Sequence, residues 1–525
     1  MSEYIIDKMA EWVCGLRYED IPDRVLKKAK LQILNILAAA FSGKHYGTLG
    51  SIRSINLPDG PSTVLSTGEK TTAEYASFIN AIYSMSFDFD DYLFMAHPGH
   101  SSVLVALSMG EELNLTIKDI ITAQVAVNEI EGRIGASVLL GPHNGQMWSY
   151  IHAIGAAASV SMLLGLTRRQ IASAMAVSMY QPNYPLTPGF MISDSKLTTA
   201  AIPIITGMFG ARLAKAGMHG NTGILETKGG FLEKFSYLPL KTMLSGFGEW
   251  WVTDSISFKP YPGCAYMDTT IDSIYKIMSE CKQKTGKDLD ANDIKHIYIS
   301  AGILTIGMNK MAEMNDTGTL DPVNINFSIP KSAAITIINH GLLAKHLSSG
   351  MLSAHEQEIN ALSKKVVLSH DWTYTLKTIA SFYDAVGGRF LFAGTGIYKL
   401  LKAFHLMRKN LPKIPLQSVR LLKARRALSG QERDTIVDGL KRKYDHVNMN
   451  AFTFSFGSRV NIELYNNSTY EAESKIPKGA SNTDDQEEVV RNKLKHAVES
   501  EQKAKMLMDI LKPDARVRAF VDGIV

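Results

Sequence analysis

The stretch IHAIGAAASVSMLL, residues 151–164, decides the fold that we expect. It is apolar on nearly every face, and a helix of that kind is normally central to a bundle. The small residues 155–159 would let neighbouring helices approach closely, and Gly165 would end the helix. The sequence therefore predicts a helical body built around residues 151–164.

Helical patterns continue on both sides of this stretch. Residues 25–41 are rich in Ala, Leu and Ile, with Gly43 as a stop signal, and residues 200–214 form a second apolar run. Three capping boxes predict further helix starts, namely Thr71 with Glu74, Thr116 with Asp119, and Thr167 with Gln170. We therefore expect the first half of the chain to be helical.

The pattern changes after about residue 258. Residues 295–300 (KHIYIS), 419–422 and 459–464 (RVNIEL) read as strands, and Asn466 and Asn467 supply a turn before a return strand at 469–474. A helical pattern returns over residues 487–525. The predicted fold class is therefore mainly α with an inserted α/β domain. We place the helical domain at 1–256, the α/β domain at 257–478 and the returning helices at 479–525.

Composition fits a globular chain with more than one core, since the protein has 525 residues, 45% of them hydrophobic and 20% charged. The net charge is only +5, but residues 371–455 hold 15 Lys and Arg against 6 Asp and Glu, an excess of +9. This basic insertion has two interpretations. It is a solvated helical face, or it is a patch for an anionic partner or substrate.

Several protein classes are not expected. We find no apolar run of the roughly 20 residues that span a bilayer, and no secretory signal at the N-terminus. Cys14, Cys264 and Cys281 lie far apart without a CxxC pair, which argues against a disulfide framework or zinc finger and favours a cytoplasmic protein. No phosphate-binding glycine loop is convincing and no GxSxG elbow occurs. We also expect no nucleic-acid partner.

The densest polar cluster is FDFDDY at residues 87–92, followed by HPGH at 97–100. Carboxylates and histidines this close together suggest acid–base or metal chemistry. The alternative is a helix end that carries surface acids. A metal site is disfavoured because DFDD lacks the spacing of a calcium loop and no HExxH is present.

Two further polar segments interrupt apolar surroundings. In DSK, residues 194–196, Lys196 is either a solvated loop residue or a charge near a cavity, where desolvation would lower its pKa. In KPYPGC, residues 259–264, two prolines suggest a rigid connector at the start of the α/β domain. Ligand clefts commonly form at such junctions.

Taken in order, FDFDDY with HPG, GAAAS at 155–159, DSK, KPYPGC, and RVNIEL followed by Pro477-Lys478-Gly479 resemble the MmgE/PrpD family. The resemblance covers nearly the whole chain except roughly 371–455. It implies a helical domain with an α/β lid, a homodimer, and an active site in the cleft between the two domains. It also implies a small-molecule substrate and no cofactor or metal.

The resemblance also assigns functional roles to individual residues of this chain. The resemblance places the catalytic residues at Asp88, His97 and Lys196, with His97 as the acid–base group and Asp88 orienting it. It places substrate-binding residues at Tyr92, where a threonine is common, at Lys259, and at three positions where this chain departs from the family, namely Gln146, Asp268 and Ser332.

The chain departs from the family pattern at several places. Gln146 stands where a histidine is usual, and the neighbouring His143 and His152 are candidates to compensate. Ala265 and Asp268 replace an arginine and a histidine, and Ser332 replaces a tyrosine seen in some members. Arginine binds carboxylates through two hydrogen bonds, so its loss makes the pocket worse for a tricarboxylate.

We therefore expect a cofactor-independent lyase or isomerase. It would abstract a proton α to a carbonyl or carboxylate, in a dehydration, decarboxylation or epimerisation of a small organic acid or a related metabolite. One alternative is a cyclase or rearrangement enzyme of specialised metabolism that acts on a less anionic substrate. Another is a non-catalytic binding or scaffold protein.

Overall fold

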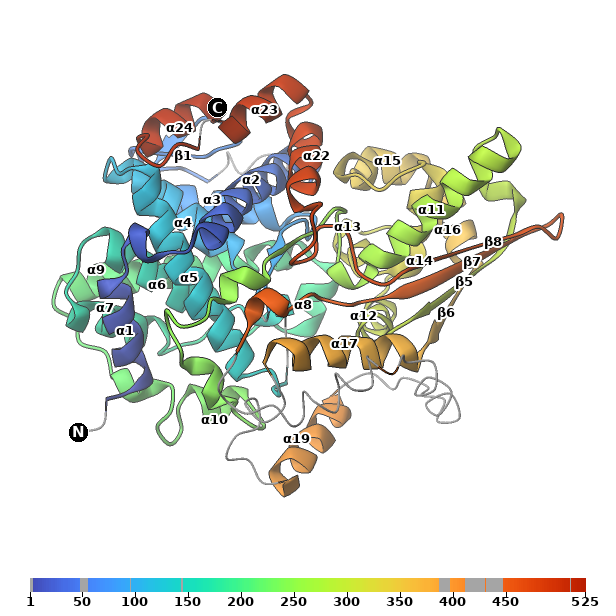
Figure 1. Cartoon of the computed structure of the whole chain (residues 1–525). Helices are drawn as coiled ribbons and strands as arrows, with labels where there is room; N and C mark the ends of the chain where they lie inside the picture. Colours follow the sequence, from blue (N-terminus) through green and yellow to red (C-terminus); the bar gives the residue numbers. More distant parts are fainter. Residues whose placement is uncertain are drawn as a thin grey trace.

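The computed structural model describes residues 3–47, 55–94, 96–142, 145–386, 397–410, 430, 447–509 and 511–525. Its first half is a helical body (Figure 1). The helices of this body are α1 (Ile5–Gly15), α2 (Asp23–Tyr46), α3 (Ala73–Met85), α4 (Gly99–Glu112), α5 (Ile117–Ser137), α6 (Ile151–Leu163), α7 (Arg168–Ser178), α8 (Thr187–Ile192), α9 (Thr198–Lys215) and α10 (Phe231–Phe235).

Helix α6 lies at the centre of this body, as its sequence predicted. It packs against α4, α5, α7 and α9, and all its residues from Ile151 to Ser161 are buried. The predicted capping boxes at Thr116 and Thr167 are confirmed at the starts of α5 and α7. The cap of α3 is Thr72 rather than Thr71, because Thr72 accepts the backbone hydrogen bond from Tyr75.

We had predicted that Gly43 ends a helix, and this prediction is wrong. It lies inside α2, where a Cβ atom would stand 1.8 Å from the carbonyl oxygen of Tyr83. The glycine therefore allows α2 and α3 to approach closely.

The second part of the chain adds a four-stranded mixed sheet with the order β6-β5-β7-β8. Strands β5 and β6 are parallel, and the other two pairings are antiparallel. The strands are β5 (Ile294–Ala301), β6 (Val366–His370), β7 (Ser458–Leu464) and β8 (Thr469–Ser474). The sequence did not reveal β6, and the strand predicted at 419–422 lies outside the described residues.

Helices accompany this sheet, and α11 packs on β7 and β8 and on α14 (Figure 1). The helices of this part are α11 (Asp268–Thr285), α12 (Ile303–Met314), α13 (Pro322–Ile325), α14 (Ile329–Ile338), α15 (Ser349–Ala354), α16 (Glu356–Ser363), α17 (Trp372–Ala385) and α19 (Ile397–Asn410). The chain then returns to the helical body with α22 (Gln486–Val498), α23 (Glu501–Asp509) and α24 (Val517–Ile524), and α22 packs on α2.

The expected fold class, mainly α with an inserted α/β domain, is confirmed. The boundaries 1–256, 257–478 and 479–525 stay predictions. Two large apolar cores accompany the two parts, one within the helical body and one between the sheet and α11, α14 and α16. Because Phe87, Phe89 and Tyr261 belong to the second core, segments of both parts meet at residues 87–91 and 259–261.

Two sequence features need a further remark. The segment Asp194–Lys215, which contains α9, is long and apolar enough to cross a membrane by length and composition, a longer apolar stretch than we had predicted. Its 61% burial inside the protein is that of a core helix. In the basic insertion, Lys399, Lys402 and Lys409 are exposed on α19, while residues 411–429 lie outside the described residues.

Candidate active site

The segment 87–91 is the framework of the site. It follows α3, and its side chains alternate, so that Phe87 and Phe89 enter the second core while Asp88 and Asp90 bind lysines. Asp88 has a φ of 54°, in the left-handed region, which Asp tolerates better than most residues. The short strands β3 (Asp91–Tyr92) and β4 (Ser257–Phe258) pair antiparallel and thereby fix Lys259 beside this segment.

Lys259 joins the two carboxylates. Its Nζ lies 2.6 Å from Oδ1 of Asp90, 3.4 Å from Oδ2 of Asp88 and 2.7 Å from the carbonyl oxygen of Asp88. Burial alone would lower the pKa of Lys259, but the carboxylates of Asp88 and Asp90 raise it above its ordinary value. Lys259 is therefore a fixed positive charge.

Lys196 reaches Asp88 from the turn before α9. Its Nζ donates to Oδ1 of Asp88 at 3.0 Å and lies 5.5 Å and 5.4 Å from the ring centres of Phe190 and Phe327. Burial raises the pKa of Asp88, but Lys196 and Lys259 outweigh burial and hold it below its ordinary value. Of the two alternatives for Lys196, the solvated loop residue is wrong, since its side chain is fully buried.

His97 bonds to Asp90, not to Asp88 as we had predicted. Its Nδ1 lies 2.8 Å from Oδ2 of Asp90 and 3.1 Å from the carbonyl oxygen of Asp91. Asp88 instead accepts a hydrogen bond from Lys196 and lies beside Lys259. If Nδ1 donates to Asp90, Nε2 carries the lone pair and is the basic atom.

The exposure of His97 sets it apart from its neighbours. Its side chain is 16% exposed, whereas those of Asp90, Lys196 and Lys259 are fully buried. Burial raises the pKa of Asp90, but Lys259 and His97 then hold it well below its ordinary value. The site therefore presents an imidazole backed by an ionised carboxylate.

His100 contacts the same carboxylate from α4. Its Nε2 lies 3.3 Å from Oδ2 of Asp90, and its Nδ1 lies 2.7 Å from Oγ of Ser84. Burial lowers the pKa of His100, so this ring is neutral near pH 7. We had noted His100 in HPGH but did not assign it to the site, because nothing in the sequence shows that both histidines reach one aspartate.

Gln146 also reaches Asp90. Its Nε2 lies 3.3 Å and 3.4 Å from the two carboxylate oxygens, and no hydrogen bond to its buried Oε1 is found among the described residues. His152 bonds to Ser101 at 2.8 Å, beside Glu131, and so does not take over this position. His143 lies outside the described residues.

Asp268 is a fully buried acid in the same region. Burial, and secondly Asp272, raise its pKa well above the ordinary value, and neither carboxyl oxygen has a hydrogen-bond partner within the described part of the chain. Burial likewise raises the pKa of the nearby Cys264 thiol to about 12. Tyr92 is buried between the ring of His97, 6.1 Å away, and that of Phe454.

Ser332 is not joined to this cluster by a hydrogen bond. Its Oγ donates to the carbonyl oxygen of Ile325 at 3.1 Å within its own part of the fold. Over the described ranges, no group of three His, Cys, Asp or Glu is arranged to hold a metal ion. The assigned functional roles of all these residues stay predictions.

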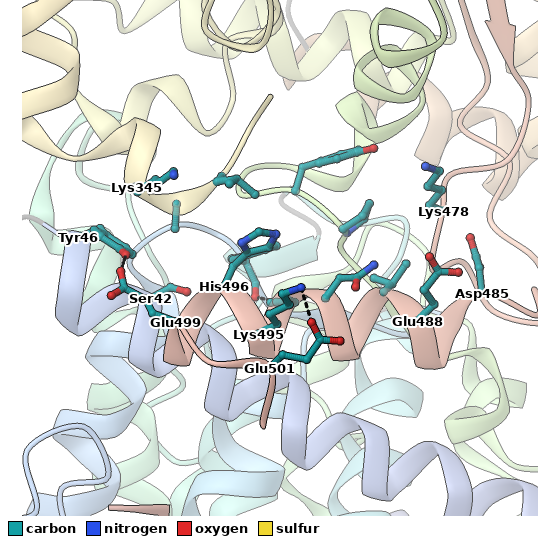
Figure 2. A pocket seen from close by; sticks show the side chains of 18 of the residues that line it. Ser42, Tyr46, Lys345, Lys478, Asp485, Glu488, Lys495, His496, Glu499 and Glu501 are labelled. Carbon is teal, nitrogen blue, oxygen red and sulfur yellow. Dashed lines mark hydrogen bonds and ion pairs between the residues drawn. The ribbon is translucent and has the colours of Figure 1, made fainter. Parts of the chain in front are cut away.

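A cavity of about 670 Å³ borders the same segments (Figure 2). It lies among α2, α22 and the turn around Lys345, and Phe89, Pro260 and Lys493 also line it. Lys493 is buried and donates to Oδ1 of Asn35 at 2.7 Å and to the carbonyl oxygen of Phe89. Burial lowers the pKa of Lys493 to about 7. No local signal in the sequence marks Lys493, which lies within the amphipathic pattern of α22.

Comparison with known proteins gives a consistent result. Residues 7–240 match the profile of the MmgE/PrpD N-terminal domain. Cis-aconitate decarboxylase of Aspergillus terreus (strain NIH 2624 / FGSC A1156) is 24% identical over 387 residues, which cover 69% of this chain and 78% of the relative. The human cis-aconitate decarboxylase is 25% identical over 276 residues, 50% of this chain and 57% of the relative. A cis-aconitate decarboxylase-like protein of Aspergillus oryzae is 26% identical over 325 residues, 56% of this chain and 65% of the relative.

Proposed function

Because the chain belongs to the MmgE/PrpD family, we propose that it is a cofactor-independent lyase or isomerase that moves a proton on the carbon next to a carboxylate. The observation that carries this proposal is the pair of His97 and Asp90. It offers a partly exposed imidazole whose Nδ1 is held by a buried, ionised carboxylate. Such a group contributes about 10²–10⁴-fold to a proton transfer.

The lysines supply the electrostatic part of the mechanism. When a proton leaves the α-carbon, negative charge develops on the carboxylate or carbonyl oxygens of the resulting enolate. Lys196, which donates to one oxygen of Asp88, is the cation held in place for this charge, while Lys259 keeps Asp88 and Asp90 ionised. Preorganised charge of this kind needs no reorganisation during the reaction.

Dehydration, decarboxylation and epimerisation share this step or its reverse. His97 removes the α-proton in the first and third, and returns a proton to the carbon after carbon dioxide leaves in the second. Asp268, whose pKa burial raises well above its ordinary value, is the second acid that we propose for a leaving hydroxyl group. The similarity to cis-aconitate decarboxylases favours decarboxylation among the three.

A second candidate is a cyclase or rearrangement enzyme of specialised metabolism on a less anionic substrate. Ala265 and Asp268 favour it, because neither supplies a positive charge for a carboxylate. In one version Lys196 forms a Schiff base with a carbonyl substrate. Borohydride treatment with the substrate would then label Lys196, and an unlabelled Lys196 excludes this version.

The third candidate, a binding or scaffold protein without catalysis, is separated from the others by kinetics. We expect His97→Gln and Lys196→Ala each to lower the exchange of α-protons of candidate acids with D₂O, followed by NMR, by at least about 100-fold. His296→Gln on β5 and Lys287→Ala in the loop before β5, neither of which bonds to a residue of this cluster, are the matched controls. Exchange that neither site variant alters would refute the assignment, provided that circular dichroism shows intact folds.

We also propose a cytoplasmic homodimer. Helix α9 exposes Ile202, Phe209 and Leu213, which are spaced along one face of the helix, and an apolar stripe of this kind suits a second copy of the chain. The cysteines are free, as expected in a reducing compartment. Light scattering should give the mass of two chains, and Phe209→Glu should return it to that of one.

A further inference from the structure

The cavity of about 670 Å³ is separate from the candidate active site. Phe89 and Pro260 line it, while the carboxylates on either side of Phe89 bind the lysines of the candidate active site. Neither His97 nor Lys196 is among the residues that line it. Its volume lies within the range of about 300–1,000 Å³ that is typical of pockets for small molecules. The cavity therefore has the size of a ligand site of its own.

Cations from both parts of the fold meet in this cavity. Lys345 comes from the turn Ala344–Leu347 of the α/β part, and His496 comes from α22 (Figure 2). Burial lowers the pKa of His496, and the neighbouring Lys345 and Lys495 lower it further. Within the described part of the chain, Lys345 forms no ion pair. A negatively charged group between Lys345 and His496 would relieve this repulsion.

A third cation is buried in the cavity wall. Lys493 lines the cavity, is 3% exposed, and donates to the neutral oxygens of Asn35 and Phe89. It forms no ion pair with any residue in the described ranges. An anion in the cavity would therefore favour the charged form of Lys493 without displacing a carboxylate that is already bound to it.

The carboxylates that line the cavity do not neutralise these cations. Three of the four accept hydrogen bonds from other groups, namely Glu499 from Tyr46, Glu501 from Lys495, and Asp485 from Gly479 and Thr483. Figure 2 shows Asp485 and the fourth, Glu488, on the side of Lys478, away from Lys345. The end of the cavity at Lys345 is therefore the end where an anion fits.

The same cavity has an apolar wall. The rings of Tyr261 and Tyr275 line it and stack with their centres 5.5 Å apart. The Tyr261 hydroxyl donates to Asp272, and the Tyr275 hydroxyl accepts from the backbone of Leu342. Since both hydroxyl groups are already hydrogen-bonded, these residues offer the cavity mainly the apolar surface of their rings.

We propose that this cavity binds a small organic anion. Its carboxylate or phosphate group lies between Lys345 and His496, and Lys493 adds positive charge in the wall. Its apolar part, a ring or a short chain, lies against Tyr261 and Tyr275. This binding site goes beyond the proposed function and does not depend on it.

Calorimetric titration of the full-length protein at pH 7 tests the ligand class. The probes are 3-phenylpropanoate, benzyl phosphate, acetate and the uncharged 3-phenylpropan-1-ol. We expect at least one of the two aromatic anions to bind about fivefold or more tightly than the alcohol. Acetate should bind about tenfold or more weakly than 3-phenylpropanoate, because it lacks the apolar part. The tighter of the two aromatic anions identifies the preferred anionic group.

Three results would overturn the proposal. They are an alcohol that binds as tightly as both aromatic anions, acetate that binds as tightly as 3-phenylpropanoate, and no saturable binding of either aromatic anion up to about 10 mM. The first removes the anion, the second removes the apolar part, and the third removes the site.

Variants of exposed residues locate the binding. Lys345→Gln and His496→Gln should each weaken the aromatic anions about twofold to fivefold and leave the alcohol unchanged. Lys287→Gln and His296→Gln, which lie outside the cavity, are the matched controls and should bind like the wild type. His97→Gln should also keep the binding. Binding that His97→Gln weakens and that Lys345→Gln and His496→Gln do not would assign the anion to the candidate active site instead and contradict the proposal.

Discussion

Two buried lysines contact the same short segment, 87–91, and are held in different charge states. Lys259 bonds to Asp90 and lies beside Asp88, and these carboxylates raise its pKa. Within the described part of the chain, Lys493 donates hydrogen bonds only to neutral oxygens, those of Asn35 and Phe89, and burial lowers its pKa to about 7. Both side chains are buried, so the difference comes from direct contact with ionised carboxylates.

This comparison shows which lysine stays positively charged near neutral pH and which one titrates there. On the Lys259 side the charge is permanent and holds Asp88 and Asp90 ionised. On the Lys493 side, next to the cavity of Figure 2, the charge titrates near neutral pH. Three substitutions, in order of expected effect, test whether the two regions differ in this way.

Lys259→Met should have the largest effect. It leaves Asp88 and Asp90 buried without their shared cation, and removing one partner of a buried ion pair lowers the free energy of unfolding by about 3–5 kcal/mol. Urea denaturation at pH 7 measures this, with the exposed Lys345→Met as the control, for which we expect a change within about 0.5 kcal/mol. A loss for Lys259→Met no larger than that of the control would mean that the two regions are equivalent.

Lys493→Met should change the dependence of stability on pH. Since the pKa of Lys493 is lowered from 10.5 to about 7, the unfolded chain binds this proton between these values and the folded protein does not. The free energy of unfolding of the wild type, relative to Lys493→Met, should therefore rise between pH 7 and 10, by about 2–4 kcal/mol in total. Denaturation curves at several pH values that stay parallel for the two proteins would show that Lys493 remains charged.

Asp91→Asn should have the smallest effect. Burial and secondly Asp90 raise the pKa of Asp91 from 3.8 to about 7, so the folded protein keeps this proton between these values. The contribution of Asp91 to stability is then greatest at low pH and falls as the pH rises toward 7. Asparagine resembles the protonated acid, so the variant should match the wild type only below about pH 4, and its stability relative to the wild type should rise by about 2–3 kcal/mol between pH 5 and pH 8. Asp91→Asn that is less stable than the wild type at pH 8 would contradict this.

Local signals predicted the helical body well. The apolar stretch 151–164 became α6, and the hydroxyl caps at Thr116 and Thr167 are in place, because both patterns depend on neighbours along the chain. The prediction for Gly43 was wrong because the role of this glycine depends on a neighbouring helix and not on residues close to it along the chain. A glycine that ends a helix and a glycine that admits a neighbouring helix look alike until the neighbour, here Tyr83 of α3, is known.

The sequence predicted most residues of the candidate site but not which residues form hydrogen bonds and ion pairs with one another. Asp88, His97, Lys196 and Lys259 all lie in short motifs, and the structure brings them together with Gln146 around two carboxylates. Which aspartates of the DFDD stretch meet Lys259 depends on the pairing of β3 with β4, whose partner residues lie far apart in the sequence. Lys493 could not be found, because its role arises only when α22 returns to pack on α2.

The backbone at Asp88 reverses the usual order of conservative replacement. At a φ of 54°, glutamate would keep the negative charge but would disfavour this backbone conformation. Asparagine would adopt the conformation but would lose the ion pairs with Lys196 and Lys259. Position 88 therefore requires both a left-handed backbone conformation and a negatively charged side chain. A saturation library selected for function should return aspartate alone there, whereas a library selected only for folding should also return asparagine and glycine.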